Sequence, residues 1–256
     1  ERKAIYHALR HAQVPVDFEL GLRGFELVLP KGVIQGQKLD LLLRELTLSV
    51  SHVSDFDELP IPFRAIASDI ERGEIHVMAK GDLARSIRAS MSVPAVFAPV
   101  RIDERLLVDG GIVGNLPVEV MQGMDVDVII AVDVEFPLYK LEELDSELTI
   151  SEQMLTKLIR KETLLQIDKH GDGDVLIRPE LGVYASTNFA DVAETIEPGQ
   201  AAAREQSSKL GRIALDPTDW AEHLAARELS SAPATNLSFV RVVHDGRLSP
   251  RVLESK

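Results

Sequence analysis

The stretch Leu106-Leu107-Val108-Asp109-Gly110-Gly111 places a carboxylate at the end of a short apolar strand and directly before two glycines. A carboxylate in this position lies at the rim of a sheet, and the glycines let another backbone or a substrate approach without a Cβ atom in the way. The same pattern also fits an ordinary turn whose first residue is acidic. Asp109 is therefore a candidate catalytic residue. The residues around it in the sequence distinguish this interpretation from that of an ordinary acidic turn.

Apolar residues at strand and helix spacings on both sides of this stretch predict an α/β fold. The predicted strands cover residues 15–22, 25–29, 63–69, 75–79, 98–102, 106–108, 128–132 and 175–178. Predicted helices begin at Gln37, at the N-cap Asp82 and at Pro117, and three more cover residues 150–167, 198–214 and 216–227. The run 128–132 is apolar at every position, which is typical of a strand buried on both faces of a parallel sheet.

The composition is that of a folded domain, since 45% of the 256 residues are hydrophobic and 27% are charged. The net charge of -13 and the scattered Lys and Arg residues argue against nucleic acid as a partner. They also disfavour general adsorption to anionic membranes, although one local basic patch could dock a headgroup. The chain has no cysteine, which excludes disulfides and thiolate chemistry.

Several segments, in one consistent order, resemble the second half of the patatin-like phospholipase domain. They are residues 32–37, 59–65, 68–70, 88–100, 107–111 and 115–118. The resemblance implies a three-layer α/β domain with a mainly parallel central sheet. In that family an Asp-Gly-Gly aspartate activates a serine directly, so the resemblance implies that Asp109 is the catalytic base, with Gly110, Gly111 and Asn115 supporting the motif.

The serine half of such a dyad is not found in this sequence, because none of the 16 glycines frames a G-x-S-x-G nucleophile elbow. We expect the elbow and the Gly-rich oxyanion loop to lie upstream of Glu1. The chain is then either a piece of an active enzyme or one part of a domain that associates with its other half; the first is favoured, because an unpaired sheet edge promotes aggregation. Ser90 and Ser92 are weaker candidates, since hydroxyls at a helix end before a proline commonly satisfy backbone groups.

The resulting functional hypothesis is a lipid acyl hydrolase that works through an acyl-enzyme on phospholipids or other acyl glycerides. It implies transient contact with a membrane surface, no cofactor and no metal, and it leaves homo-oligomer formation open. This chain by itself should then be inactive. The alternative is a non-catalytic lipid-binding or interaction domain that keeps the same fold.

Three further patterns have ordinary explanations. His7 and His11 could share a helix face and bind a metal, but solvated surface histidines are the favoured explanation, because no accompanying glutamate pattern completes a metal site. The acidic loop 168–174 invites a calcium hypothesis, yet it departs from the EF-hand pattern at His170 and Pro179. The helical stretch 157–169 combines basic and apolar residues, which fits either a lipid-facing surface or, by default, ordinary core packing.

The predicted domain boundaries are a patatin-like domain over residues 1–229, a linker over 230–236 and the start of another module over 237–256. Residues 142–163 and 237–254 resemble bacterial patatin-like proteins in which the hydrolase precedes a POTRA module and an outer-membrane β-barrel. That resemblance implies a location at the bacterial cell surface or in the medium, with the cytoplasm as the alternative.

Overall fold

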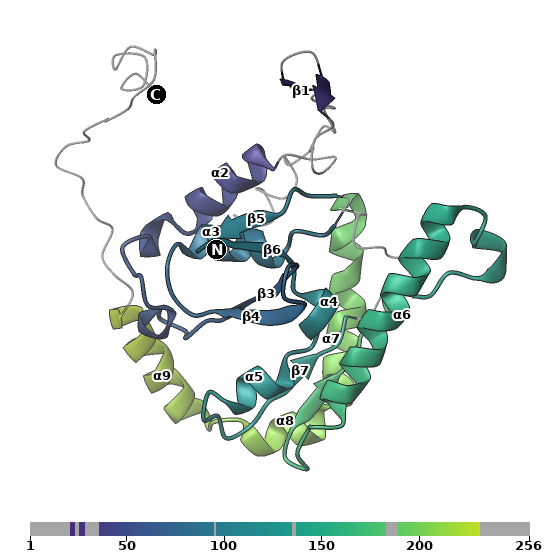
Figure 1. Cartoon of the computed structure of the whole chain (residues 1–256). Coiled ribbons are helices and arrows are strands. Elements are labelled where there is room, and N and C mark those ends of the chain that lie inside the picture. The colour runs from purple at the N-terminus through teal and green to yellow at the C-terminus, as the bar shows by residue number, and fades with distance from the viewer. Residues whose placement is uncertain are drawn as a thin grey trace.

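The computed structural model describes residues 21–23, 26–28, 36–94, 96–134, 137–182 and 189–230 (Figure 1). The strands are β1 (Gly21–Arg23), β2 (Glu26–Val28), β3 (Ala65–Asp69), β4 (Glu74–Met78), β5 (Val100–Ile102), β6 (Arg105–Asp109), β7 (Ile130–Val132) and β8 (Val175–Ile177). The α-helices are α2 (Gln37–Leu46), α3 (Leu83–Ser90), α4 (Gly111–Gly114), α5 (Val118–Gln122), α6 (Glu147–Ile167), α7 (Ile196–Glu205), α8 (Ser207–Ile213) and α9 (Pro217–Ser230). Short 3-10 turns occur at Leu48–Val50, Phe56–Glu58, Leu141–Glu143 and Phe189–Thr195.

The largest sheet in the described residues has the strand order β4-β3-β6-β5, and all three pairings are antiparallel. Short turns connect β3 to β4 and β5 to β6, and such turns can join only antiparallel neighbours. Gly73 in the first turn has a φ of 67°, and Asp103 and Glu104 in the second have φ values of 45° and 63°. The expected mainly parallel central sheet is therefore not confirmed; the parallel pairing seen is that of β7 with β8.

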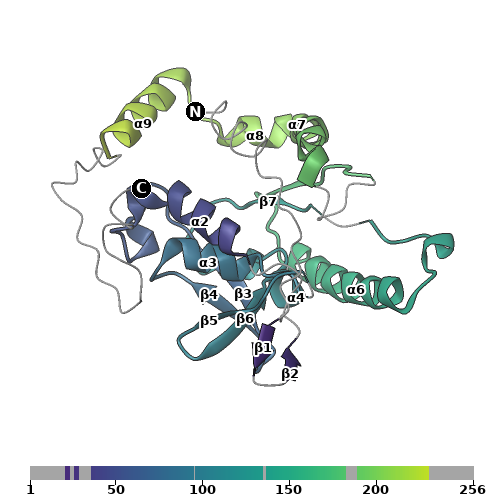
Figure 2. The ribbon, with the colours of Figure 1, turned by 90° about the horizontal axis from the view of Figure 1, so that it is seen from above.

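Helices cover both faces of this sheet. Side chains alternate along β3, so that Ala67 packs with Ala89 of α3 while Ile66 approaches Gly114 of α4 from the opposite face. Helix α2 lies against α3, and α6 lies against α4. Figure 2 shows α2 and α3 together beside the sheet, with α6 extending away from it. The sheet and its two helical layers thus agree with the layered arrangement expected from the sequence.

Two details of the predicted elements are wrong. The run 128–132 was expected to be buried on both faces, but Ile130 and Val132 are each 49% exposed and Ala131 alone of the three strand residues is buried. The strand pairs with β8 and buries only one face, on Leu116 and its neighbours. The predicted helix 198–214 is two helices, because the chain turns at Gln206 between α7 and α8.

The other predicted elements are confirmed where the structure describes them. Asp82 caps α3, since its side chain accepts a hydrogen bond from the N–H group of Arg85 at 3.0 Å. The predicted linker from residue 231 onward, the tail 237–256 and the histidines His7 and His11 lie outside the described residues. The predicted domain boundaries accordingly stay predictions.

Helix α6 differs from the core-packing expectation on its apolar face. Leu158 and Leu165 are exposed, whereas Gln153, Thr163 and Gln166 are buried. Polar contacts fasten this buried face, including a hydrogen bond of 3.1 Å from the N–H group of Glu119 to Gln166. Amphipathic spacing located the helix correctly but did not identify all of its buried side, because polar contacts as well as the packing of Ile167 on the Leu116 cluster join it to the domain.

Leu107 is a core residue whose truncation should be costly, because it is fully buried in β6 between β3 and β5. We expect Leu107→Ala to lower the free energy of unfolding by about 2 to 5 kcal/mol, through lost apolar contacts and the cavity left behind. Leu164→Ala on α6 is the matched control, since Leu164 is 48% exposed and such surface changes cost about 0.5 kcal/mol or less. Urea unfolding of both variants measures the difference; equal losses would contradict this assignment of the core.

Candidate active site

Asp109 is the last residue of β6, and its backbone is held on two sides. Its N–H group donates to the carbonyl of Ser92 at 3.0 Å, and its carbonyl accepts from the hydroxyl of Ser68 at 2.7 Å. The next N–H group, that of Gly110, donates to the carbonyl of Ser90 at 3.2 Å. The strand end is therefore tied both to β3 and to the segment that follows α3, which fixes where the carboxylate emerges.

The two glycines after Asp109 meet different close contacts. A Cβ atom on Gly110 would lie 2.4 Å from the carbonyl oxygen of Ile66, which is backbone and cannot move aside cheaply. A Cβ atom on Gly111 would lie 2.8 Å from Oδ1 of Asp109 and 3.2 Å from Oδ1 of Asn115. Gly110 is thus required by the packing of β6 on β3, while Gly111 leaves space beside the carboxylate.

Asn115 links this motif to helix α6. Its Nδ2 donates to the hydroxyl of Thr163 at 3.2 Å, and that hydroxyl donates to the carbonyl of Ile159 at 3.0 Å. Thr163 is 2% exposed, so the connection is shielded from water. Asn115 therefore contributes by anchoring the chain after α4.

An open pocket of about 410 Å³ adjoins the Asp109 carboxylate. Most of its lining side chains are apolar, and the polar ones include Asp109, Ser90 and Asn115. The lining comprises Phe63, Arg64, Ala65, Ile66, Ile87, Ser90, Met91, Asp109, Gly110, Gly111, Gly114, Asn115 and Pro117. The pattern of the sequence identified the carboxylate, but the apolar walls come from four separate segments that only folding brings together.

Asp109 and Asp69 lie on neighbouring strands of the same sheet and have opposite electrostatic surroundings. Desolvation raises the pKa of Asp109 above its usual value of 3.8, and the Gly111 N–H group, which donates to Oδ1 at 2.8 Å, only partly opposes this. Asp69 is 1% exposed, yet its pKa is lowered to about 2, mainly by the hydrogen bond from the Arg72 guanidinium, with Arg105 adding to the effect. Among the described residues no cation forms an ion pair with Asp109. A carboxylate without a cation is the better proton acceptor of the two.

The two serines after α3 have different environments. Ser92 is fully buried; its hydroxyl donates to the carbonyl of Arg88 at 2.8 Å and accepts from the Arg88 guanidinium at 2.6 Å. Ser90 shares the pocket with Asp109, but no hydrogen bond joins its hydroxyl to the Asp109 carboxylate. Neither arrangement is that of a nucleophile held by its base, because activation requires contact between the two groups.

The acidic loop 168–174 is organised by hydrogen bonds within the protein. Asp174 accepts from the N–H groups of Ile129 and Gly171, both at 2.8 Å. In the part of the chain that the structure describes, no three His, Asp or Glu side chains are grouped so as to hold a metal ion. Within the same residues, no helix combines the length and apolar character that crossing a membrane requires.

Part of the chain, including the Asp109 motif, is similar in sequence to known proteins. Residues 7–121, which include Asp109, Gly110, Gly111 and Asn115, match the sequence profile of the family described as patatin-like phospholipase. The chain is 31% identical over 134 residues to an uncharacterized NTE family protein of Mycobacterium bovis, which is 52% of this chain and 36% of that protein. It is 40% identical over 80 residues to patatin-like phospholipase domain-containing protein 7 of Mus musculus, which is 30% of this chain and 6% of that protein. The matched part thus spans about a third or less of the length of these curated relatives. It is similar both to the patatin-like phospholipase domain and to proteins of the NTE family.

The close approach of β6 to β3 can be tested by adding a single methyl group. We expect Gly110→Ala to lower the free energy of unfolding by about 1 to 3 kcal/mol, because the new Cβ would press on the Ile66 carbonyl. Gly211→Ala in α8 meets no atom within 4 Å and should instead gain about 0.5 to 1 kcal/mol, since alanine favours helix. Chemical unfolding compares the two; a neutral Gly110→Ala would contradict the packing described.

The raised pKa of Asp109 predicts a pH dependence of stability. Because the folded state holds this proton more tightly than the unfolded state, the stabilisation is complete below pH 3.8 and is lost as the pH rises through the folded pKa. Asp109→Asn keeps the acceptor for the Gly111 N–H group and does not ionise. Its melting temperature should equal or exceed that of the parent at pH 7, and this advantage should shrink toward pH 4. A variant less stable than the parent only at neutral pH would show that the ionised carboxylate is stabilising.

Proposed function

We propose that the protein is a lipid acyl hydrolase in which Asp109 is the general base of a Ser-Asp dyad. The matches to patatin-like phospholipases and the NTE family support lipid hydrolysis at the level of the family. One observation points to Asp109 as the residue involved. Its carboxylate forms no ion pair with a described cation, and it lies at the rim of a pocket whose lining side chains are mostly apolar. The nucleophilic serine and the oxyanion donors would be supplied by protein outside these 256 residues.

In the proposed reaction, Asp109 accepts the hydroxyl proton of the serine as its oxygen attacks the ester carbonyl. Collapse of the tetrahedral intermediate expels the alcohol, which takes up that proton, and leaves an acyl-enzyme. Asp109 then accepts a proton from the water that attacks the acyl group, and it passes this proton to the serine oxygen as the fatty acid leaves and the free serine is restored. Desolvation of Asp109 favours both proton transfers, because a raised pKa makes the carboxylate a stronger base near neutral pH.

The pocket walls suit the acyl part of such a substrate. Phe63, Ile66, Ile87 and Met91 form an apolar surface beside the carboxylate, and an alkyl chain gains roughly 0.8 kcal/mol for each buried methylene group. Glycerolipids, phospholipids among them, present an ester next to such chains. The proposed substrates are therefore lipid esters encountered at a membrane surface.

The location proposed is the bacterial cell surface or the medium, reached through the outer membrane. It rests on the resemblance of residues 142–163 and 237–254 to secreted patatin-like proteins. The tail 237–256 would then begin a POTRA module.

Asp109→Asn in the protein that carries the nucleophile should lower kcat for phospholipid hydrolysis by about a hundred- to ten-thousand-fold, the usual cost of losing a general base. The amide keeps the size and one acceptor of the carboxylate, so the loss should fall on the chemical step and leave melting temperature nearly unchanged. Fatty acid release and acyl-enzyme burst, measured on the same preparation, provide the readout. Parental turnover with a normal burst would remove Asp109 from the mechanism.

Asp69→Asn is the matched control, because Asp69 is a buried carboxylate on the same face of the adjoining strand. It should lower the melting temperature at pH 7, since the lowered pKa of Asp69 stabilises the fold above pH 3.8 and that contribution is lost as the pH falls through about 2. Turnover per folded molecule should be retained. If the parent protein binds lipid but releases no fatty acid, a non-catalytic lipid-binding role becomes the better account.

A further inference from the structure

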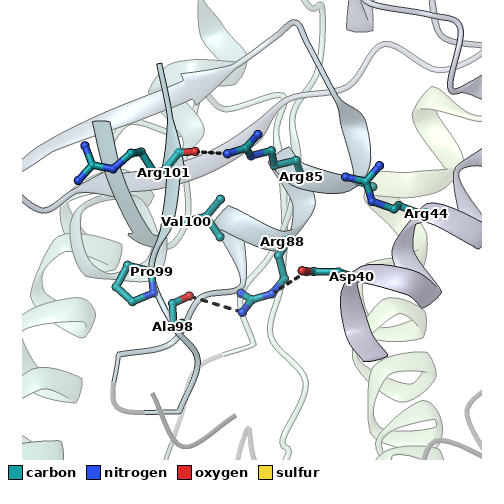
Figure 3. A pocket seen from close by; sticks show the side chains of 9 residues that line it. Asp40, Arg44, Arg85, Arg88, Ala98, Pro99, Val100 and Arg101 are labelled. Carbon is teal, nitrogen blue, oxygen red and sulfur yellow. Dashed lines mark hydrogen bonds and ion pairs between the residues drawn. The ribbon is translucent and has the colours of Figure 1, made fainter. Parts of the chain in front are cut away.

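A second pocket, of about 340 Å³, is lined in part by helix α3, and Figure 3 shows its lining side chains. Ala84, Arg85 and Arg88 of α3 line it, whereas Ile87, Ser90 and Met91 of the same helix line the first pocket. Asp40 and Arg44 of α2 and the backbone around β5 complete its walls. The two pockets therefore have no lining residue in common.

Arg88 is the unusual residue of this second pocket, because a guanidinium is rarely buried. Only 4% of the residue is exposed, its Nη1 donates to Ser92, and its guanidinium lies over Phe97, with Cζ 4.9 Å from the ring centre. The backbone of Gly36 covers it so closely that a Cβ there would lie 2.6 Å from Nη2. Burial lowers the pKa of Arg88 from its usual value, and the charge of Asp40 opposes this.

The hydrogen-bonding capacity of Arg88 is incompletely used. Its Nε makes no hydrogen bond to a described residue, although Oδ1 of Asp40 lies 3.2 Å away, and its Nη2 reaches the Ala98 carbonyl only at 3.4 Å. Asp40 is itself about half exposed. A buried guanidinium with a half-solvated counterion and spare donors is suited to accept a second anion.

Two more guanidinium groups flank Arg88 in Figure 3. Arg44 makes only a long, exposed ion pair with Asp82, at 3.5 Å. Arg85 donates to the carbonyl of Arg101 at 2.5 Å, and no carboxylate among the described residues forms an ion pair with it. Four arginines, Arg44, Arg85, Arg88 and Arg101, thus line one pocket with a single carboxylate, that of Asp40, in a chain whose net charge is -13. Such a local reversal of sign concentrates anions.

We propose that this pocket binds a phosphate group, held by Arg44, Arg85 and Arg88. The Asp40 carboxylate, which already lies beside Arg88, competes with the phosphate for that guanidinium. Planar guanidinium forks match the oxygens of a phosphate better than a single ammonium does. The site is distinct from the Asp109 pocket, since the two pockets share no lining residue, and it does not depend on the hydrolase proposal. The phosphate could belong to a lipid headgroup or to a small soluble phosphate compound.

The test is binding to the 256-residue chain, measured by calorimetric titration with inorganic phosphate and by sedimentation with phosphatidylcholine vesicles that do or do not contain phosphatidic acid. We expect Arg44→Gln combined with Arg85→Gln to weaken binding by about tenfold or more, as expected for losing two charge-assisted contacts. Both side chains are at the surface, so the fold should survive. Binding to inorganic phosphate identifies a soluble ligand class, and binding only to phosphatidic acid vesicles identifies a headgroup site.

Arg204→Gln combined with Arg212→Gln is the matched control, because it removes two exposed positive charges from α7 and α8. It should leave the affinity within about twofold, since distant charges are screened by salt. Asp40→Asn should strengthen binding several-fold by removing the competing carboxylate from Arg88. No binding to either probe, equal losses in the two double variants, or unchanged affinity in Asp40→Asn would overturn the proposal.

Discussion

The contact on which the rest of the structure depends is the hydrogen bond from the N–H group of Asp109 to the carbonyl of Ser92. It joins the end of β6 to the segment that leaves α3, and so sets the position of the carboxylate relative to the helix that walls its pocket. The Ser92 hydroxyl in turn makes two hydrogen bonds to Arg88: it donates to the Arg88 carbonyl and accepts from the Arg88 guanidinium. A single buried serine thus connects the motif at the sheet edge with Arg88 of the basic pocket.

Local electrostatics then distinguish residues of the same type. Asp69 and Asp109 are carboxylates on adjoining strands, but Arg72 and Arg105 neutralise the first, while the second accepts from the Gly111 N–H group and forms no ion pair with a described residue. A charge that is compensated stabilises the fold, whereas a charge that is desolvated without compensation costs stability and becomes reactive. Arg88 is the cationic counterpart, since it too is buried with an incomplete set of partners.

Much of the local structure follows from the sequence. The apolar spacing and the cap at Asp82 predict α3, the charged turns predict both hairpins, and the pair of glycines marks the close approach of β6 to β3. Asp109 is a candidate from the sequence because it directly follows a short apolar strand and precedes two glycines. These features depend on neighbours within a few residues, and such neighbours are specified by the chain itself.

What the sequence by itself determined is therefore the order of the elements, the turns and the motif at Asp109. Only the tertiary structure decided that the main described sheet is antiparallel, that Ile130 and Val132 keep an exposed face, and that Arg44, Arg85 and Arg88 share a pocket. Burial and pKa are properties of what surrounds a group, and those surroundings come from segments far apart in the chain. The exposure of scattered arginines and of an all-apolar strand therefore cannot be predicted from their own residues. It depends on how other segments pack against them and exclude water.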